Sequence, residues 1–400
     1  MVDDGGQWDP TRLERFGRRL RIAMVGGGLG SFIGEAHRIA FRVDGMWELV
    51  AGAFSRNPAT SAATGRALLL DPERVYPDYR ALIAAEASRP DRPDAVLVAT
   101  LPDTHEEICS ALLEAGFHVI AEKPLTSTVD QAERVVDAVG RTGRRLLLTH
   151  CDSGYPMVRQ ARDMVADGSL GRVTVVDTEF SNGSQTVPGA GGAWRVDATQ
   201  VGEAGMLLDV GTHALHLVTY VTGVRIDTVS ARLHRLDPRH TVFDNAFLDL
   251  GLAGGAVGRC WSTFQAAGSV HGLRISVVGE LGSVHWVQTD PEVLWWRPAN
   301  EPAQLLTRAG TGATAGAVEA SRFAPGHPDG YGLAFANLYR DFGEALLAEA
   351  LGEDPTPLLA GVPDQFDGLH TLEVVDAALR SAAAEGRSVT VRDPALRARR

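Results

Sequence analysis

The chain has 400 residues, 44% of them hydrophobic and 22% charged, and a formal net charge of −12 at pH 7. These values are typical of an ordinary globular protein with two or three domains. The negative charge argues against a nucleic-acid binder, which needs lysines and arginines clustered on one face, but it leaves room for a small anionic ligand.

The cysteines and the lengths of the apolar runs exclude further classes of protein. Cys109, Cys151 and Cys260 have neither the spacing of a disulfide framework nor that of a zinc site. No stretch has the apolar core of a signal peptide or the ~18 apolar residues of a membrane span. We therefore expect a cytoplasmic protein that holds no metal and binds no membrane.

Residues 1–19 are predicted to be a loosely ordered polar extension, and residues 20–150 a first domain. In that domain short apolar runs alternate with helical patterns, which predicts βαβ units and a parallel sheet with helices on both faces. The predicted strands are Ile22–Val25, Trp47–Phe54, Asp94–Thr100, Phe117–Ala121 and Leu146–Thr149, and the clearest helices are Ile33–Val43 and His105–Ala115.

Residues 151–400 are predicted to be a second domain, used for substrate binding and oligomerisation. Strands joined by short turns indicate a mainly antiparallel open sheet, and residues 300–325 are predicted to be a long loop. The predicted strands are Ile226–Arg235, Asn245–Leu252, Ala256–Gln265, Leu273–Gly279 and Ser283–Gln288, and the predicted helices are Met206–Val221, Gly332–Leu351 and Gln365–Ala384.

A glycine-rich turn, GGGLGSFIG, follows the first predicted strand directly. A dinucleotide fold needs glycines here for the tight turn, for backbone approach to the pyrophosphate and for helix–strand packing, and the helix N-terminus then faces the phosphates. A strict G-x-G-x-x-G would place its third glycine at Ser31, so we assign the role to Gly34. Gly26, Gly28, Leu29 and Gly34 are therefore candidate cofactor-binding residues; the alternative is a plain loop.

The second strand normally ends with an acid that holds the ribose 2′-hydroxyl of NAD. Here it ends with Ser55 and Arg56, which can bind a phosphate. This favours NADP(H) over NAD(H); the alternative is that Arg56 is simply solvated and the enzyme takes NAD(H).

Two further motifs carry candidate chemistry. Lys123 lies in the turn Glu122-Lys123-Pro124 after strand four, where ligands bind in such folds, and the charge of an oxidised nicotinamide would favour its neutral amine. Asp209 and His213 are four residues apart, so they share a helix face, and the aspartate could orient the histidine as an acid or base. Taken alone, the second motif could equally be a surface ion pair.

Together these motifs resemble the Gfo/Idh/MocA oxidoreductases, named after glucose-fructose oxidoreductase, inositol dehydrogenase and rhizopine catabolism proteins. The resemblance runs from about residue 20 over nearly the whole chain. It rests on the glycine turn, on His37 three residues after Gly34, and on the segments ELVAGAF, AGFHVIAEKPL and DVGTHALH. It implies a Rossmann domain followed by an α/β domain, and a homodimer or homotetramer formed through the second sheet.

The resemblance also implies that Lys123, Asp209 and His213 line the active site. His213 would exchange the hydroxyl proton, Lys123 would polarise or relay from the same oxygen, and Asp209 would hold the array and contact the substrate. Thr100, His105, Glu122 and Lys123 would contact the cofactor. The chain departs from the family in its longer glycine turn, in Thr100-Leu101-Pro102-Asp103 where Thr-Pro-Asn is common, and in His216 where many members have Asp.

The expected activity is hydride transfer between NAD(P) and a secondary alcohol or ketone of a sugar, glycoside or cyclitol. One alternative is an enzyme that uses bound NAD for transient oxidation, enabling elimination or glycoside cleavage; another is a non-catalytic, nucleotide-responsive binding protein. The predicted substrate-binding residues are Tyr155, Arg159, Trp194, Arg195, Asp197, His216 and His327.

Overall fold

The computed structural model describes residues 9–187 and 192–392. The chain divides into two compact units. The first comprises the chain up to Thr126, Asp130–Gly154 and Tyr331–Gly368, and the second comprises Ser127–Val129, Tyr155–Gly330 and the chain from Leu369. Residues 331–368 therefore belong with the first unit, although the sequence assigned them to the second domain. Within the described ranges, no helix has the length and apolar character needed to cross a bilayer.

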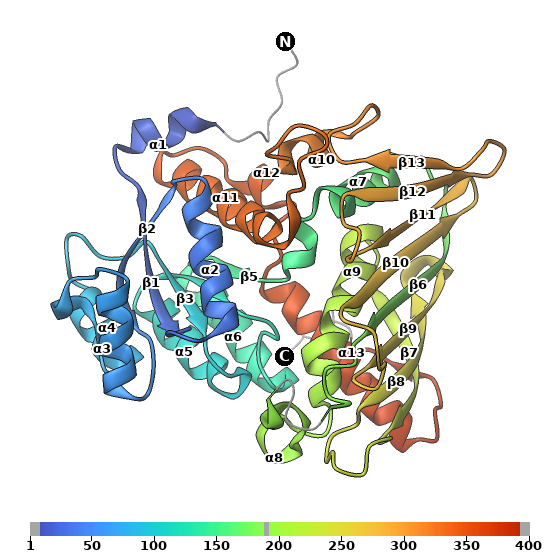
Figure 1. Cartoon of the computed structure of the whole chain (residues 1–400), viewed down its shortest axis with the longest axis horizontal. Coiled ribbons are helices and arrows are strands. Elements are labelled where there is room, and N and C mark those ends of the chain that lie inside the picture. The colour runs from blue at the N-terminus through green and yellow to red at the C-terminus, as the bar shows by residue number, and fades with distance from the viewer. Residues whose placement is uncertain (1–8, 188–191, 393–400) are drawn as a thin grey trace. The chain divides into compact units, whose positions relative to one another are not determined.

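The first unit contains a five-stranded parallel sheet, as predicted, with the strand order β2-β1-β3-β4-β5 (Figure 1). All five predicted strands are present, because each is a short apolar run that the sheet buries. The strands are β1 (Leu20–Gly26), β2 (Trp47–Ala53), β3 (Ala95–Ala99), β4 (His118–Ala121) and β5 (Leu146–Leu148).

A C-terminal helix completes the core of this unit. Alternate β1 residues, Leu20, Ile22 and Met24, join one buried cluster with Phe41 of α2 (Phe32–Val43) and Phe342 of α11 (Gly330–Ala350). One face of the sheet is therefore covered partly by a segment distant in sequence. The remaining helices are α3 (Pro58–Ala67), α4 (Tyr79–Glu86), α5 (His105–Glu114), α6 (Val129–Thr142) and α12 (Thr356–Leu359).

Part of the predicted N-terminal extension is a short helix. Asp9 caps α1 (Pro10–Phe16), and its side chain accepts a hydrogen bond from the amide of Thr11 at 2.9 Å. Arg12 forms ion pairs of 2.8 Å with Glu344 and with Glu353. The expectation of a loose extension is therefore wrong for residues 10–16, which these contacts hold against the first unit.

The second unit contains a nine-stranded sheet with the order β13-β12-β11-β10-β6-β9-β8-β7-β14. All its pairs are antiparallel except β6 with β9. The strands are β6 (Val173–Ser181), β7 (Ile226–His234), β8 (Asn245–Leu252), β9 (Val257–Thr263), β10 (Gly272–Gly279), β11 (Gly282–Val287), β12 (Val293–Pro298), β13 (Gln304–Thr307) and β14 (Val389–Thr390).

The sequence missed the central strand β6, the strand β12 and the two edge strands β13 and β14. Residues 300–325, predicted to be a loop, also contain α10 (Ala315–Ala320), so that prediction is wrong in part. The partners of β6 lie far away in the sequence, in β9 and β10, whereas β12 and β13 pair with neighbours along the chain but lie in or beside the region that was assigned to a loop.

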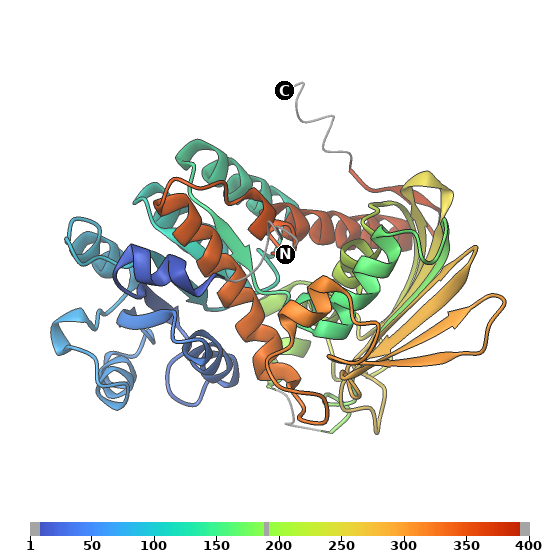
Figure 2. The ribbon, with the colours of Figure 1, turned by 90° about the horizontal axis from the view of Figure 1, so that it is seen from above.

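Helices cover one face of the second sheet (Figure 2). They include α9 (Thr212–Thr222), which contacts β6 and β10, and α7 (Pro156–Ala166), which packs on α9; the long α13 (Gln365–Ala383) lies in the same layer. The opposite face exposes large apolar side chains, among them Phe247, Val257 and Trp295. Phe247 stacks on Trp261 with ring centroids 6.1 Å apart.

Candidate active site

The glycine-rich turn needs glycine at two of the predicted positions. A Cβ atom on Gly26, which has φ +83°, would lie 2.3 Å from the carbonyl oxygen of Ala99. A Cβ on Gly34 would lie 2.3 Å from the carbonyl oxygen of Gly27. Gly34 therefore lets the first turn of α2 pack against the loop, which is the role that the sequence assigned to it.

The residue at the strict third-glycine position caps the helix instead. Ser31 accepts a hydrogen bond from the amide of Gly34 at 3.1 Å, so α2 begins at Phe32. The amide of Leu29 donates to Thr64 Oγ1 at 3.1 Å. A Cβ on Gly28 would lie 3.0 Å from the carbonyl oxygen of Phe54. The inserted residues are thus an ordered part of the turn.

A pocket of about 420 Å³ lies beside this turn, within the first unit. Val25 and Gly26 of β1, Ser55 and Arg56 after β2, and Thr100 after β3 line it. It therefore lies at the carboxyl ends of three neighbouring strands, where the strand order reverses and where dinucleotides bind in such sheets. The residues present fit a dinucleotide. The sequence analysis did not find Tyr79, Arg80 and Glu107, which also line the pocket.

The Glu122-Lys123-Pro124 turn is fixed by a buried carboxylate, and the Lys123–Pro124 bond is cis. Glu122 accepts hydrogen bonds from Nε2 of His37 at 2.9 Å, from Thr149 Oγ1 at 2.5 Å and from the amide of Lys123 at 3.2 Å. Burial would raise the pKa of Glu122, but the hydrogen bond from His37 and the charge of Lys123 outweigh it, so this pKa is lowered. An ionised carboxylate therefore lies directly beside Lys123.

Tyr339 of α11 completes this network. Its hydroxyl lies 2.8 Å from Nδ1 of His37, and both side chains are buried. Burial raises the pKa of Tyr339 well above its usual value, so the phenol stays protonated and donates. Nδ1 of His37 is then the acceptor, which puts the ring proton on Nε2, facing Glu122. No motif in the sequence points to Tyr339, which is one residue of a predicted helix.

His105 links two further loops of the first unit. Its Nδ1 lies 3.0 Å from the carbonyl oxygen of Pro124, and its Nε2 lies 3.2 Å from that of Thr100. Burial lowers the pKa of His105, which favours the neutral ring. A neutral ring has one N–H, so the predicted residue donates to one of these two carbonyl oxygens and lies between the turn after β3 and the turn that carries Lys123.

The second unit carries Asp209 and His213. The predicted helix is present, but its first turn, Leu207–Gly211, is a π-helix, and α9 follows from Thr212. Asp209 and His213 therefore do not have the spacing of a regular α-helix, and the sequence could not show this. Single π turns are frequent at functional sites. The ring of His213 lies edge-on to Phe180 of β6, with centroids 5.5 Å apart.

A segment that we call the strap, residues 192–203, brings a predicted substrate residue to Asp209. Nε of Arg195 donates to Asp209 Oδ2 at 3.1 Å, and the guanidinium carbon lies 4.3 Å from the centroid of the Trp194 ring. Asp197 caps the short helix α8 (Ala198–Val201) by accepting the amide of Thr199 at 2.9 Å. Arg195 and Asp209, predicted separately as a substrate residue and a catalytic residue, are therefore in contact within one unit; their roles stay predictions.

The other predicted substrate residues lie elsewhere in the second unit. Tyr155 and Arg159 are buried at the start of α7, and the Tyr155 ring lies 5.3 Å from that of Trp286. His216 is buried, with its ring 5.5 Å from that of Tyr220. His327 is exposed, and its carbonyl oxygen accepts from the buried Arg308 at 2.5 Å. A substrate contact by any of these four residues stays a prediction.

Two family models match the chain. Residues 20–150 match the "Oxidoreductase family, NAD-binding Rossmann fold", and residues 158–285 match the "GFO/IDH/MocA C-terminal domain". The chain is 33% identical to the "Uncharacterized oxidoreductase YfiI" of Bacillus subtilis, over 91% of this chain and 94% of that protein. It is 26% identical to the levoglucosan dehydrogenase of Pseudarthrobacter phenanthrenivorans, over 92% of this chain and 97% of the enzyme.

A solved structure gives a similar result. An inositol dehydrogenase homologue from Azotobacter vinelandii, complexed with NADH and myo-inositol, is 38% identical to this chain. The match covers 94% of this chain and 98% of the homologue, with a TM-score of 0.87. In its NAD+ complex the same homologue gives a TM-score of 0.88.

Proposed function

Because the chain belongs to the GFO/IDH/MocA family of NAD-binding oxidoreductases, we propose that it moves a hydride between NAD(P) and a secondary alcohol or ketone of a sugar, glycoside or cyclitol. The observation that carries this proposal is the Lys123 turn, which a buried ionised network holds at the carboxyl edge of a dinucleotide-type sheet. The relatives named for inositol and levoglucosan support the polyol class.

The catalytic roles follow from the chemistry of the side chains. The bound cofactor would supply the carbon that accepts or releases hydride. His213 exchanges the proton of the substrate hydroxyl, Lys123 polarises the same oxygen, and Asp209 holds the array through Arg195. The substrate is bound by the predicted set Tyr155, Arg159, Trp194, Arg195, Asp197, His216 and His327.

For the cofactor, we propose a preference for NADP(H). Ser55 and Arg56 line the pocket at the end of β2, in place of the acid that would repel a 2′-phosphate. Arg56 is exposed and can pair with a phosphate group. The similar solved structures hold NAD+ or NADH, so this preference would be a departure from them.

We also propose that the protein is a cytoplasmic homodimer or homotetramer built on the open face of the second sheet. Exposed apolar side chains interspersed with ion pairs, here Arg259–Asp177 and Arg274–Glu179, are typical of an interface between subunits. Phe247, Val257, Trp295 and Leu305 are exposed there. All three cysteines are free and buried, which suits a reducing compartment.

A turnover screen tests the activity. Inositols, sugars and glycosides are each incubated with NAD+ or NADP+, and both reduced cofactor and organic product are measured. Net reduction of the cofactor supports the proposal, whereas product without net reduction would assign the recycling chemistry instead. Lys123→Ala and His213→Ala should each lower kcat by at least about 100-fold, with little change in cofactor affinity. A variant with near-normal kcat would remove that residue from the proposed mechanism.

A further inference from the structure

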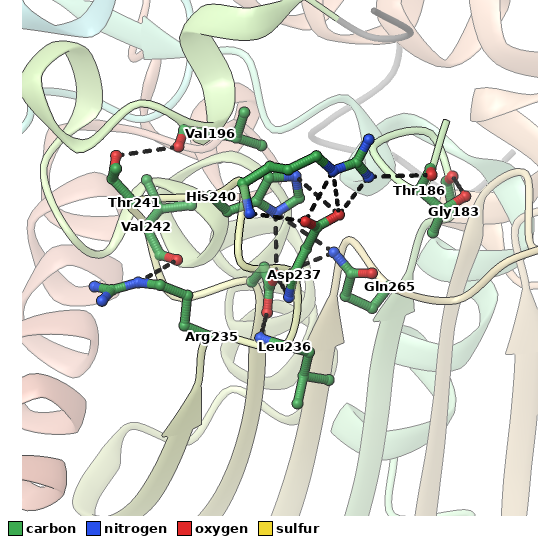
Figure 3. Close-up of polar contacts among 12 residues, drawn as sticks. Gly183, Thr186, Val196, Arg235, Leu236, Asp237, His240, Thr241, Val242 and Gln265 are labelled. Atoms are coloured by element: carbon green, nitrogen blue, oxygen red, sulfur yellow. Dashed lines mark hydrogen bonds and ion pairs between the residues drawn. The ribbon is translucent and has the colours of Figure 1, made fainter. Parts of the chain in front are cut away.

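The loop between β7 and β8, residues 235–244, is built around one buried carboxylate (Figure 3). Asp244 accepts hydrogen bonds from the amides of Leu236 at 2.8 Å and Asp237 at 2.9 Å. It also accepts from His240 Nδ1 and from Gln265 Nε2, each at 3.0 Å. A buried carboxylate is costly unless such donors surround it. The four donors therefore hold this loop, which we call the Asp244 loop, in one shape.

Thr241 and Phe243 of the Asp244 loop form hydrogen bonds with the strap. The amide of Thr241 donates to the carbonyl oxygen of Val196 at 3.0 Å, and Thr241 Oγ1 accepts from the amide of Ala198 at 2.7 Å. Thr241 Oγ1 also lies 3.3 Å from the Val196 carbonyl oxygen. The amide of Phe243 donates to the carbonyl oxygen of Glu203 at 2.9 Å. The strap is thus anchored to the loop along its length.

The part of the strap that Thr241 binds, Val196 and Ala198, follows directly after the arginine that contacts Asp209. Val196 follows Arg195 directly, and Arg195 makes the 3.1 Å ion pair with Asp209. A shift of the Val196 carbonyl would therefore move both Trp194 and Arg195. None of the proposed catalytic or substrate-binding residues lies in the Asp244 loop, so the loop would act through the strap.

We propose that Thr241 and the Asp244 loop are positioning elements that set substrate affinity by fixing Trp194 and Arg195. The inference rests on the proposed function, because it takes the strap to be part of the polyol site. Loss of the anchor should weaken polyol binding and leave cofactor binding unchanged, because the residues that line the dinucleotide pocket belong to the other unit.

The test uses Thr241→Val, which removes the hydroxyl but keeps the shape of an exposed side chain. Thr241→Ser restores the hydroxyl. Thr174→Val is the matched control, because the Thr174 hydroxyl also bonds a backbone oxygen, that of Val278 at 3.2 Å, but contacts no part of the strap. Two measurements are made with myo-inositol as the probe: steady-state kinetics, and hydrogen exchange of residues 192–203 with and without the polyol.

Thr241→Val should raise KM about tenfold, the amount expected for two lost hydrogen bonds, with cofactor affinity unchanged. It should also abolish the protection of the strap by myo-inositol, and Thr241→Ser should restore both. An active Thr241→Val enzyme with wild-type KM would overturn the inference, as would a wild-type strap that myo-inositol does not protect. Failure of the proposed function is distinct, because it appears as wild-type protein that turns over no polyol.

Discussion

Tyr339 donates its phenol proton to Nδ1 of His37 over 2.8 Å, although 302 positions separate the two residues. His37 in turn reaches Glu122, whose carboxylate accepts the amide of Lys123. A helix from the C-terminal part of the chain therefore helps to hold the turn that carries the proposed catalytic lysine.

Removal of this phenol should affect both stability and turnover. Tyr339→Phe leaves Nδ1 of His37 without its donor in the interior, so we expect a loss of about 1–3 kcal/mol in the free energy of unfolding. The release of the Glu122 turn should also lower kcat. Urea denaturation and steady-state kinetics measure the two effects.

The matched control is Tyr76→Phe, because the Tyr76 hydroxyl donates to the buried Glu86 at 2.8 Å in the same unit. Tyr76→Phe should lower the free energy of unfolding about as much as Tyr339→Phe does, but its kcat should equal that of the wild type. Equal kcat values in the two variants would mean that the Tyr339 network is only structural.

A methyl group at position 34 should distort the glycine-rich turn that we assign to the dinucleotide pyrophosphate. Its Cβ would meet the Gly27 carbonyl oxygen at 2.3 Å, which forces the loop away from α2. Gly34→Ala should therefore lower cofactor affinity at least about tenfold, as measured by calorimetric titration. Gly140→Ala in α6 is the control, because a Cβ there meets nothing within 4 Å; it should bind cofactor normally and gain about 0.5–1 kcal/mol of stability. Normal affinity in Gly34→Ala would argue against this turn as the pyrophosphate site.

The proposed NADP(H) preference depends on Arg56. Arg56→Ala should weaken NADP+ binding about tenfold and leave NAD+ binding almost unchanged, because only the 2′-phosphate pairs with the guanidinium. Arg66→Ala removes the same charge from an exposed position that does not line the pocket. Fluorescence titration with NAD+ and with NADP+ measures the two dissociation constants, and their ratio gives the cofactor preference of each variant. An equal loss for the two nucleotides would assign Arg56 to a contact that they share.

Acid should destabilise the first unit through His118. Burial, together with the charge of Arg144, lowers the pKa of His118 from its ordinary value of about 6.5 to about 4, and its Nδ1 accepts a hydrogen bond from the amide of Arg145 at 3.1 Å. The unfolded state therefore binds the proton first as the pH falls, so stability is lost from about pH 6.5 downward. Between about pH 7.5 and about pH 5 this single site should cost roughly 2 kcal/mol.

Urea denaturation at the two pH values measures this loss. His118→Asn keeps an acceptor but does not titrate, so its loss of stability should be smaller by that amount. Equal losses in the wild type and the variant would show that other groups cause the acid sensitivity.

The open sheet face should mediate self-association. Phe247 is 51% exposed on β8, and a carboxylate in its place would be buried unpaired at an interface on this face. Phe247→Glu should therefore shift the protein towards monomer in sedimentation velocity experiments. Leu69→Glu, at a position that is 92% exposed in the first unit, should leave the assembly unchanged. Wild-type sedimentation of Phe247→Glu would exclude this face as the interface.

Much of the first unit follows from local patterns. Its five strands are short apolar runs, and Gly34 is predicted from its place as the next glycine after Ser31 in the glycine-rich turn; the structure then shows why no side chain fits there. The second unit was predicted less completely. The strand β6 lies at the centre of the sheet, and its place depends on pairing with β9 and β10, which are distant from it in the sequence.

The sequence by itself determined the parallel sheet, its glycine turn and the motifs around Lys123 and Asp209, because these depend on backbone sterics and on the burial of neighbouring residues. Only the tertiary structure decided that α11 packs in the first unit, that Tyr339 meets His37 and that Thr241 anchors the strap. Such contacts depend on which faces of distant segments pack together, and this choice leaves no periodic trace in either segment.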